Sequence, residues 1–326
     1  MSEELLKVFE RIAFALEKIA DSLNKDKINK YPLGEPLDNM LDENKVKIPI
    51  DAIEKYLLTQ NVNIKNIPTG EEIERFLLTH NVSIKNIPPE EEADEILDKI
   101  SIFMGYRYSL IKPFYKQIKY NMNSGGTITI DLKNKTQEEI SAICQLASWL
   151  HEIAFLEEYN YLKSPRSLLF AKPNRIPKAL NFFSGKWLER FVKLQVISLL
   201  QQVNPNLKFS YLLNPQIKLP NGDDFELDSL FAIENEIYWF ETKTGKKKQK
   251  YIQKYSKVSQ ILKLRMNSCF IILTDITPSV ADDLKKMFSL NVVPIEKFSE
   301  EFLKSIKKYR TTNIKNPYDS EQNTVA

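Results

Sequence analysis

The chain has 326 residues, of which 43% are hydrophobic and 27% are charged, and its mean hydropathy is −0.35. This composition supports a packed core and excludes a wholly disordered chain, and no apolar run approaches the roughly 18 residues of a membrane span. The net charge of +3 conceals a division: residues 1–100 hold 13 Lys and Arg against 21 Asp and Glu, whereas residues 101–326 hold 33 against 22. An acidic part of charge −8 and a basic part of charge +11 indicate two different roles, and the basic part suits an anionic polymer.

The sequence features of secreted proteins are missing from this chain. It begins MSEELLKVFE, without the cationic region and apolar block of a signal peptide. Its two cysteines, Cys144 and Cys269, are too few for a disulfide scaffold or a Cys-rich zinc site. We therefore expect a cytoplasmic protein that does not act at a membrane.

Residues 1–24 are predicted to form a coiled-coil oligomerisation helix. Apolar residues recur at alternating spacings of four and three, which places one seam along the helix. They are Leu5, Phe9, Ile12, Leu16, Ile19 and Leu23. Self-association through this seam predicts a homo-oligomer, and docking of the helix on its own chain is the alternative.

Residues 25–92 are predicted to contain a linker and two repeats of 20 residues. The stretch 24–46 is polar and carries Pro32, Gly34 and Pro36, which is typical of a linker. Residues 53–68 (IEKYLLTQNVNIKNIP) and 73–88 (IERFLLTHNVSIKNIP) are nearly identical, each a short helix followed by a segment that ends at proline. Two copies are too few for a self-standing solenoid, so we expect a spacer or a docking element.

Residues 93–178 are predicted to form a mostly helical domain. Helices are expected over 90–104 and 136–153, with a strand over 127–132, and Thr136 with Glu139 fits a capping box at the start of the second helix. The segment 112–121 is basic and aromatic, which is consistent with nucleic-acid binding.

Residues 179–310 are predicted to form a mixed α/β domain, before a polar tail over 311–326 that we expect to be disordered. Apolar periodicity predicts the order αβββαβαβ, an antiparallel start followed by parallel crossovers. The helices are expected over 184–203, 249–266 and 280–288, and the strands over 208–219, 225–233, 236–242, 269–274 and 291–295.

Four charged residues of this domain form a candidate catalytic group. Glu189 lies in the opening helix, Asp228 in the second strand, and Glu241 and Lys243 at the end of the third strand after the apolar run 237–240. A hairpin that separates Asp228 from Glu241 by 13 residues places the two carboxylates side by side, and strand alternation puts Glu241 and Lys243 on one face.

Two adjacent carboxylates repel each other unless a cation lies between them, and hard oxygen ligands suit Mg²⁺ or Mn²⁺. Asp228 and Glu241 are therefore the predicted metal ligands. Such a metal polarises a phosphoryl oxygen and lowers the pKa of bound water, and a neighbouring lysine can orient that water or stabilise charge on the phosphate. This chemistry hydrolyses phosphodiester bonds.

This arrangement resembles the PD-(D/E)XK nuclease superfamily, which has the restriction-endonuclease-like fold. The amino-acid sequence at residues 185–189, 226–228 and 241–245 is most similar to the nuclease domains of CRISPR ancillary nucleases, and the resemblance covers about residues 178–300. It implies that Asp228, Glu241 and Lys243 bind metal and drive cleavage, and that Glu189 supports the metal site through water. Leu227 stands where the family usually has proline, and the sensor domain of those nucleases is not predicted.

The segment after the third strand favours a polymeric substrate, because lysines neutralise phosphates and aromatic rings stack on bases. The predicted nucleic-acid-binding residues are Lys246, Lys247, Lys248, Lys250, Tyr251, Lys254, Tyr255 and Lys257. The sequence thus predicts a metal-dependent endonuclease, with DNA favoured over RNA. The alternatives are a catalytically idle nuclease fold that binds nucleic acid, or a scaffold protein.

Overall fold

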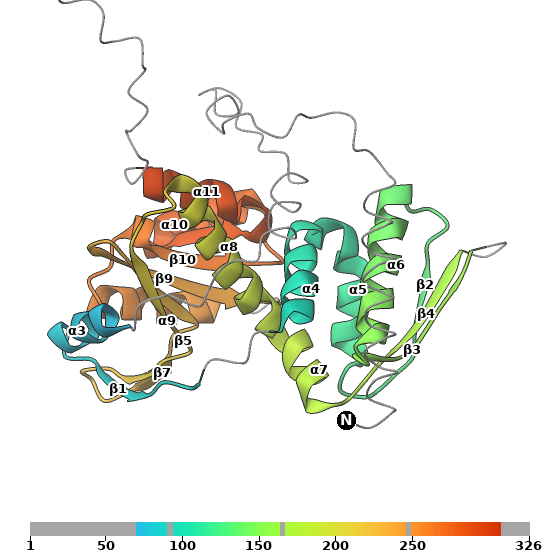
Figure 1. The fold of residues 1–326 in the computed structure, drawn as a ribbon, viewed down its shortest axis with the longest axis horizontal. Helices are drawn as coiled ribbons and strands as arrows, with labels where there is room; N and C mark the ends of the chain where they lie inside the picture. The colour runs from blue at the N-terminus through green and yellow to red at the C-terminus, as the bar shows by residue number, and fades with distance from the viewer. Residues whose placement is uncertain (1–69, 90–93, 164–166, 246–248, 308–326) are drawn as a thin grey trace, which may run out of the picture. The chain divides into compact units, whose positions relative to one another are not determined.

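The computed structural model describes residues 70–89, 94–163, 167–245 and 249–307 (Figure 1). The predicted coiled coil, the first repeat and the polar tail lie outside these residues, so those three expectations stay predictions. So do the lysines at 246–248 and the side chain of Lys250.

A five-stranded mixed sheet forms the centre of the C-terminal part, which confirms the predicted mixed α/β architecture. Its order is β11-β10-β9-β8-β5, with the β5–β8 and β8–β9 pairs antiparallel and the β9–β10 and β10–β11 pairs parallel. The strands are β5 (Phe209–Leu213), β8 (Ser229–Ile233), β9 (Glu236–Lys243), β10 (Cys269–Leu273) and β11 (Asn291–Pro294).

Helices cover both faces of this sheet, because its central strands are apolar on both sides. Trp239 of β9 packs into a cluster with α9 (Gln249–Ile261) and α10 (Pro278–Phe288). The alternate residues Tyr238 and Phe240 pack into a second cluster with α8 (Trp187–Val203) and α11 (Phe298–Ile306). Helix α9 ends at Ile261, earlier than the predicted residue 266.

Two of the predicted strands are each broken into two. The predicted strand 208–219 bends between β5 and β6 (Gln216–Lys218), where Asn214 adopts a left-handed backbone with φ +50° ahead of Pro215. The predicted strand 225–233 divides into β7 (Asp224–Glu226) and β8, and Asp228 lies in the break between them rather than inside a strand. The first break lies at the dipeptide Asn214-Pro215 and the second at the consecutive polar residues Asp228-Ser229, neither of which ended the predicted strands.

The second repeat is part of the folded core, not a free spacer. It forms α3 (Glu71–Thr79) and β1 (Ser83–Asn86), and β1 joins β6 and β7 in a three-stranded antiparallel sheet. Its Ile73 and Leu77 side chains are fully buried against the cluster that contains Trp239. The repeat therefore supports the same sheet that carries the candidate catalytic residues.

Truncation of Leu77 should destabilise the protein by about 2–5 kcal/mol, because Leu77→Ala removes a fully buried side chain and leaves a cavity. Leu78→Ala is the matched control, since its neighbouring side chain is 64% exposed, and we expect a change within about 0.5 kcal/mol. Denaturant unfolding measures both values. Equal, small effects of the two substitutions would contradict the packing of the second repeat.

The part predicted as mostly helical also contains a three-stranded sheet. Helices α5 (Tyr108–Asn121) and α6 (Gln137–Glu152) pack beside it, and α4 (Glu95–Tyr106) packs on these two helices (Figure 1). Helix α6 begins with the predicted capping box of Thr136 and Glu139. The sheet has the order β2-β4-β3, from β2 (Ile128–Asp131), β3 (Leu156–Leu162) and β4 (Leu168–Pro173).

This helical part is joined to the large sheet by a continuous core. Helix α4 packs along α8, and one hydrophobic cluster runs from α4, α5 and α6 through α8 to β9 and β10. A short helix α7 (Pro177–Asn181) and a segment over Phe182–Lys186 that is kinked at Gly185 lead into α8. Within the described ranges, no helix is long and apolar enough to cross a membrane.

Candidate active site

Asp228, Glu241 and Lys243 meet at the end of β9, as the hairpin spacing predicts. The Nζ atom of Lys243 lies 3.3 Å from Oε1 of Glu241 and 3.6 Å from Oδ2 of Asp228. The backbone N–H of Asp228 donates to Oε2 of Glu241 at 3.2 Å. Two carboxylates and one ammonium therefore form a single charged group.

Hydrogen bonds from backbone and side-chain groups of β9 fix both carboxylates. The N–H and the hydroxyl of Thr242 donate to Oδ2 of Asp228 at 2.8 and 2.9 Å. The indole N–H of Trp239 donates to Oε2 of Glu241 at 3.1 Å. Oε1 of Glu241 accepts from Lys243 at 3.3 Å, and no hydrogen bond among the described residues is formed to Oδ1 of Asp228.

Both carboxylates are buried, with Asp228 8% and Glu241 2% exposed. Burial, together with the adjacent charge of Asp228, raises the pKa of Glu241 well above its ordinary value. Burial by itself lowers the pKa of Lys243, but the charges of Glu241 and Asp228 outweigh it and raise this pKa. Burying two carboxylates together costs several kcal/mol in desolvation, and the attraction of the half-buried Lys243 offsets only part of this cost. Such a cluster is typical of a functional site.

Glu189 lies next to this group, at the start of α8. Burial and the charge of Asp228 raise its pKa to about 7, although Lys186 donates to its Oε2 atom at 2.9 Å. The helix glutamate predicted from the sequence is therefore beside the strand carboxylates, and the four residues form one site.

Asn214 is a component of the site that the sequence analysis missed. Its backbone N–H donates to the carbonyl of Asp228 at 3.0 Å. With the amide oriented to satisfy both neighbours, its nitrogen donates to Oε2 of Glu189 at 3.2 Å and its oxygen accepts from Lys186 at 2.8 Å. Asn214 thus links the helix glutamate to the strand aspartate. The dipeptide Asn-Pro at 214–215, a common turn signal, is the sequence feature that marks this position.

The left-handed backbone conformation of Asn214 can be tested directly. Asn214→Ala should be less stable than Asn214→Gly by about 1–2 kcal/mol, because alanine is strained at positive φ whereas glycine is not. Both variants lose the amide contacts to Glu189 and Lys186, so the difference in free energy of unfolding isolates the backbone. Equal stability of the two variants would contradict the left-handed conformation.

The predicted nucleic-acid-binding residues of α9 divide into two groups. Tyr251, Lys254 and Lys257 are exposed, and Lys254 lies 4.5 Å above the ring of Phe225. Tyr255 differs from the prediction because it is only 4% exposed and packs against Trp239, with Lys243 5.9 Å from its ring centre. The Tyr255 ring is part of the core next to the site, so it is not available to stack on a base.

Helix α5 brings further positive charge to the same end of the sheet. Lys119 donates to the hydroxyl of Thr244, directly after β9, at 3.2 Å. Lys112 and Lys116 lie 3.0 and 3.4 Å from Asp275, after β10. The basic segment noted in the sequence therefore lies beside the candidate catalytic strand, at the carboxyl ends of the parallel strands.

The donor set fits a divalent cation that keeps part of its water shell. Mg²⁺ is commonly bound through one or two carboxylates plus waters and substrate phosphate. Oδ1 of Asp228 and Oε1 of Glu241 are the oxygens that the protein backbone leaves to such an ion. No group of three or more His, Cys, Asp or Glu suited to a metal occurs in the described part of the chain, so an all-protein cage is not formed there.

Comparisons with known proteins give a similarity of fold only. No family model and no curated protein matches the chain. Two solved structures resemble it in part. Protein VC1899 from Vibrio cholerae has 18% identity and a TM-score of 0.48 over 73% of this chain and 61% of its own. Can2 from Sulfobacillus thermosulfidooxidans, solved with cyclic tetra-adenylate, has 13% identity and a TM-score of 0.47 over 72% of this chain and 58% of its own.

The chain thus spans less than two-thirds of the length of either structure. At these identities and scores the likeness does not extend to activity, substrate or ligand. Function is therefore inferred from the side chains of the site.

Proposed function

We propose that this protein is a metal-dependent nuclease of the PD-(D/E)XK type, which hydrolyses phosphodiester bonds of nucleic acid, with DNA favoured over RNA. The single observation that carries the proposal is the cluster of the buried carboxylates Asp228 and Glu241 with the half-buried Lys243, whose ammonium lies within 3.6 Å of both carboxylates. A cluster of this kind costs stability and matches the chemistry of phosphodiester hydrolysis.

The proposed mechanism assigns a role to each side chain. Asp228 and Glu241 would hold Mg²⁺ or Mn²⁺, which supplies a polarised phosphoryl oxygen and a bound water of lowered pKa. Thr242 and Trp239 keep the two carboxylates in place through their hydrogen bonds. The Lys243 ammonium stabilises the negative charge that develops on the phosphate, and Glu189 orients water at the edge of the site.

A second candidate function is a catalytically idle fold that binds nucleic acid. The observation in its favour is that Lys243 already contacts both carboxylates and so neutralises part of their charge without a metal. The two candidates differ in one property, since only the nuclease requires the cation.

The test is a cleavage assay on linear, circular and single-stranded DNA and on RNA, with Mg²⁺, with Mn²⁺ and with EDTA. We expect cleavage with either metal, none with EDTA, and loss of cleavage in Asp228→Asn, which keeps the shape of the side chain. Asp224→Asn is the matched control, because Asp224 is an exposed carboxylate of the preceding strand, paired with Lys85. Metal-independent binding without cleavage would favour the idle fold, and cleavage that survives Asp228→Asn would exclude the assigned site.

A further inference from the structure

Helix α5 carries lysines and an exposed aromatic ring at the end of the sheet where the candidate site lies. Lys112, Lys116 and Tyr120 follow one another at intervals of four residues, and Lys119 adjoins Tyr120, so the four side chains share one face of the helix. The helix contains no Asp or Glu. This α5 face is therefore cationic and aromatic, and it suits an anionic polymer with flat bases.

Lys119 is a half-buried cation of the α5 face with neutral hydrogen-bond acceptors. Its Nζ atom donates to the carbonyl of Ser184 at 3.0 Å and to the hydroxyl of Thr244 at 3.2 Å. Among the described residues no carboxylate forms an ion pair with Lys119, and burial lowers its pKa. A charge that has lost part of its water and is not balanced by a carboxylate favours an anionic ligand.

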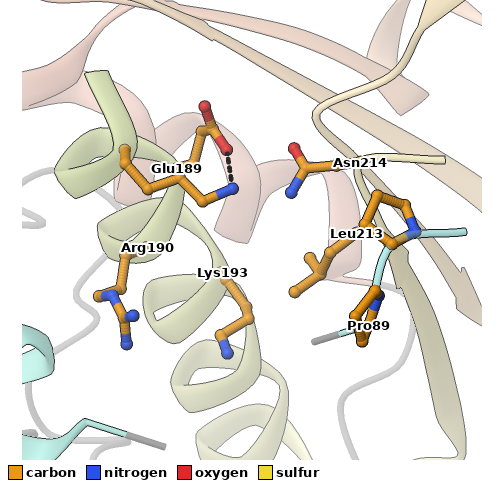
Figure 2. Close-up of a pocket in the computed structure, with 8 residues that line it drawn as sticks. Pro89, Glu189, Arg190, Lys193, Leu213 and Asn214 are labelled. Carbon is orange, nitrogen blue, oxygen red and sulfur yellow. Dashed lines mark hydrogen bonds and ion pairs between the residues drawn. The ribbon is translucent and has the colours of Figure 1, made fainter. Parts of the chain in front are cut away.

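The contacts of Lys119 fix it beside the candidate active site. Thr244 directly follows Lys243 at the end of β9, and Ser184 precedes α8, the helix that carries Glu189. The hydroxyl of Thr244 also donates to the carbonyl of Ser184 at 3.0 Å, which joins the two elements. Glu189 itself lines a pocket of about 140 Å³ between α8 and the end of β5 (Figure 2). Lys119 is thus held by the same two elements that carry Lys243 and Glu189.

The other two lysines anchor α5 against the end of β10. The Nζ atoms of Lys112 and Lys116 lie 3.0 and 3.4 Å from Oδ1 of Asp275. The charge of Lys112 also acts on Glu296, a partly buried carboxylate whose pKa is raised by burial. The charge of these two lysines is therefore largely balanced within the protein, and Lys119 is the cation of the α5 face that remains for a ligand.

Tyr120 is the most exposed large hydrophobic side chain among the described residues, at 84%. It lies next to Lys119 in the chain and one helical turn after Lys116, so its ring and the two ammonium groups share one surface. Proteins that follow a nucleic-acid strand combine cations on the phosphates with aromatic rings on which the bases stack. The α5 face contains both components beside the candidate site.

From these observations we infer that Lys119 and Tyr120 form a subsite for the nucleotide next to the bond to be cut, with Lys119 on its phosphate and Tyr120 stacked on its base. This inference rests on the proposed nuclease function and adds to it the contacts that hold the strand. Both residues bind the substrate, and neither takes part in the chemical step.

The first experiment tests the stacking by fluorescence anisotropy in EDTA with two labelled probes. One is a single-stranded DNA oligonucleotide, and the other is an abasic oligonucleotide of the same length and charge. Tyr120→Ala should weaken binding of the DNA about fivefold or more, the effect of losing one stacked base, and leave binding of the abasic probe unchanged. Tyr120→Phe keeps the ring and should bind as the wild type does. Met287→Ala is the control, because it truncates another exposed side chain, on α10.

The second experiment tests the phosphate contact over a series of NaCl concentrations. Lys119→Gln should weaken binding of both probes about fivefold at about 0.1 M salt, because one lost single-strand contact removes about 0.7 from the slope of log K against log salt. Glutamine can still donate to the Ser184 carbonyl, and Lys119→Arg should restore most of the affinity. Lys304→Gln is the control, since Lys304 is an exposed lysine of α11 that pairs with Glu300 and Glu301.

A Tyr120→Ala protein that binds the DNA as the wild type does, or that loses the same affinity for both probes, would overturn the inference. Equal affinity and salt slope for Lys119→Gln and Lys304→Gln would overturn it as well. A parallel Mg²⁺ cleavage assay separates the two proposals. Asp228-dependent cleavage with no effect of Lys119 or Tyr120 on Kd refutes the subsite alone, whereas the expected changes in Kd without any cleavage support the subsite and refute the nuclease.

Discussion

Lys243→Met should reduce the rate of phosphodiester cleavage by about 10²–10³-fold, the usual cost of removing one well-placed electrostatic group from an active site. The Lys243 ammonium is within 3.6 Å of both carboxylates, and methionine keeps the length of the side chain without its charge. The loss should appear in kcat, because the charge that Lys243 stabilises develops in the transition state. Single-turnover cleavage under saturating enzyme measures it.

Lys254→Gln supplies the contrast for this experiment. Lys254 is an exposed lysine of the adjacent helix α9 that lies over Phe225 and contacts neither carboxylate. We expect its replacement to raise KM and to leave kcat within a few-fold of wild type. A Lys243→Met enzyme with unchanged kcat, or one whose only defect is in KM, would remove Lys243 from the proposed mechanism.

Glu241→Gln should abolish the stabilisation of the protein by Mg²⁺. At a tenfold excess of Mg²⁺ over its Kd, binding to the folded state adds about 1.4 kcal/mol, or about 2 °C in Tm for a chain of 326 residues. The amide removes one of the two predicted ligands but can still accept the hydrogen bonds of Trp239 and of the Asp228 backbone. Thermal unfolding with and without Mg²⁺ measures the shift.

The same substitution should change how stability depends on pH without metal. The folded-state pKa of Glu241 is raised, so its protonated form is favoured in the folded protein. Its contribution to stability is therefore present below the unfolded pKa, near 4.3, and is lost as the pH rises from there toward the folded pKa. Relative to wild type, Glu241→Gln should show a weaker fall in Tm over this range.

Asp224→Asn tests whether this pattern is specific to the buried site. The ion pair with Lys85 lowers the pKa of Asp224, so its stabilising effect is present above the unfolded pKa and is lost as the pH falls. Its replacement should leave the Mg²⁺ shift intact. An unchanged Mg²⁺ shift in Glu241→Gln, or its loss in Asp224→Asn, would contradict the assignment of the metal ligands.

The proximity of the candidate site residues was largely predictable because Asp228, Glu241 and Lys243 are close to one another in the sequence. Glu241 and Lys243 share a face of β9 through strand alternation, and the hairpin between β8 and β9 brings Asp228 to Glu241. The mixed order of the central sheet followed equally from apolar periodicity, since buried parallel strands are continuous apolar runs. These are local properties, and local properties are visible in a sequence.

The exact surroundings of the site were less visible. The break at Asn214 and the position of Asp228 between β7 and β8 depend on the pairing of β6 and β7 with β1, which is more than 120 residues away in the chain. The burial of Tyr255 depends on Phe225 and Trp239 packing over it. Tyr251 and Tyr255 are four residues apart in the same basic helix, and the sequence pattern does not show that the first is exposed and the second is buried.

The division of charge can be counted in the sequence, and the central strands are predicted from the pattern of apolar residues along each segment. The candidate residues Glu189, Asp228, Glu241 and Lys243 were predicted from their positions on these elements. Only the tertiary structure placed the second repeat in the core and connected Asn214 to Glu189 and Asp228. These features arise from contacts between segments far apart in the chain, whose energy depends on three-dimensional packing rather than on the periodicity of any one segment.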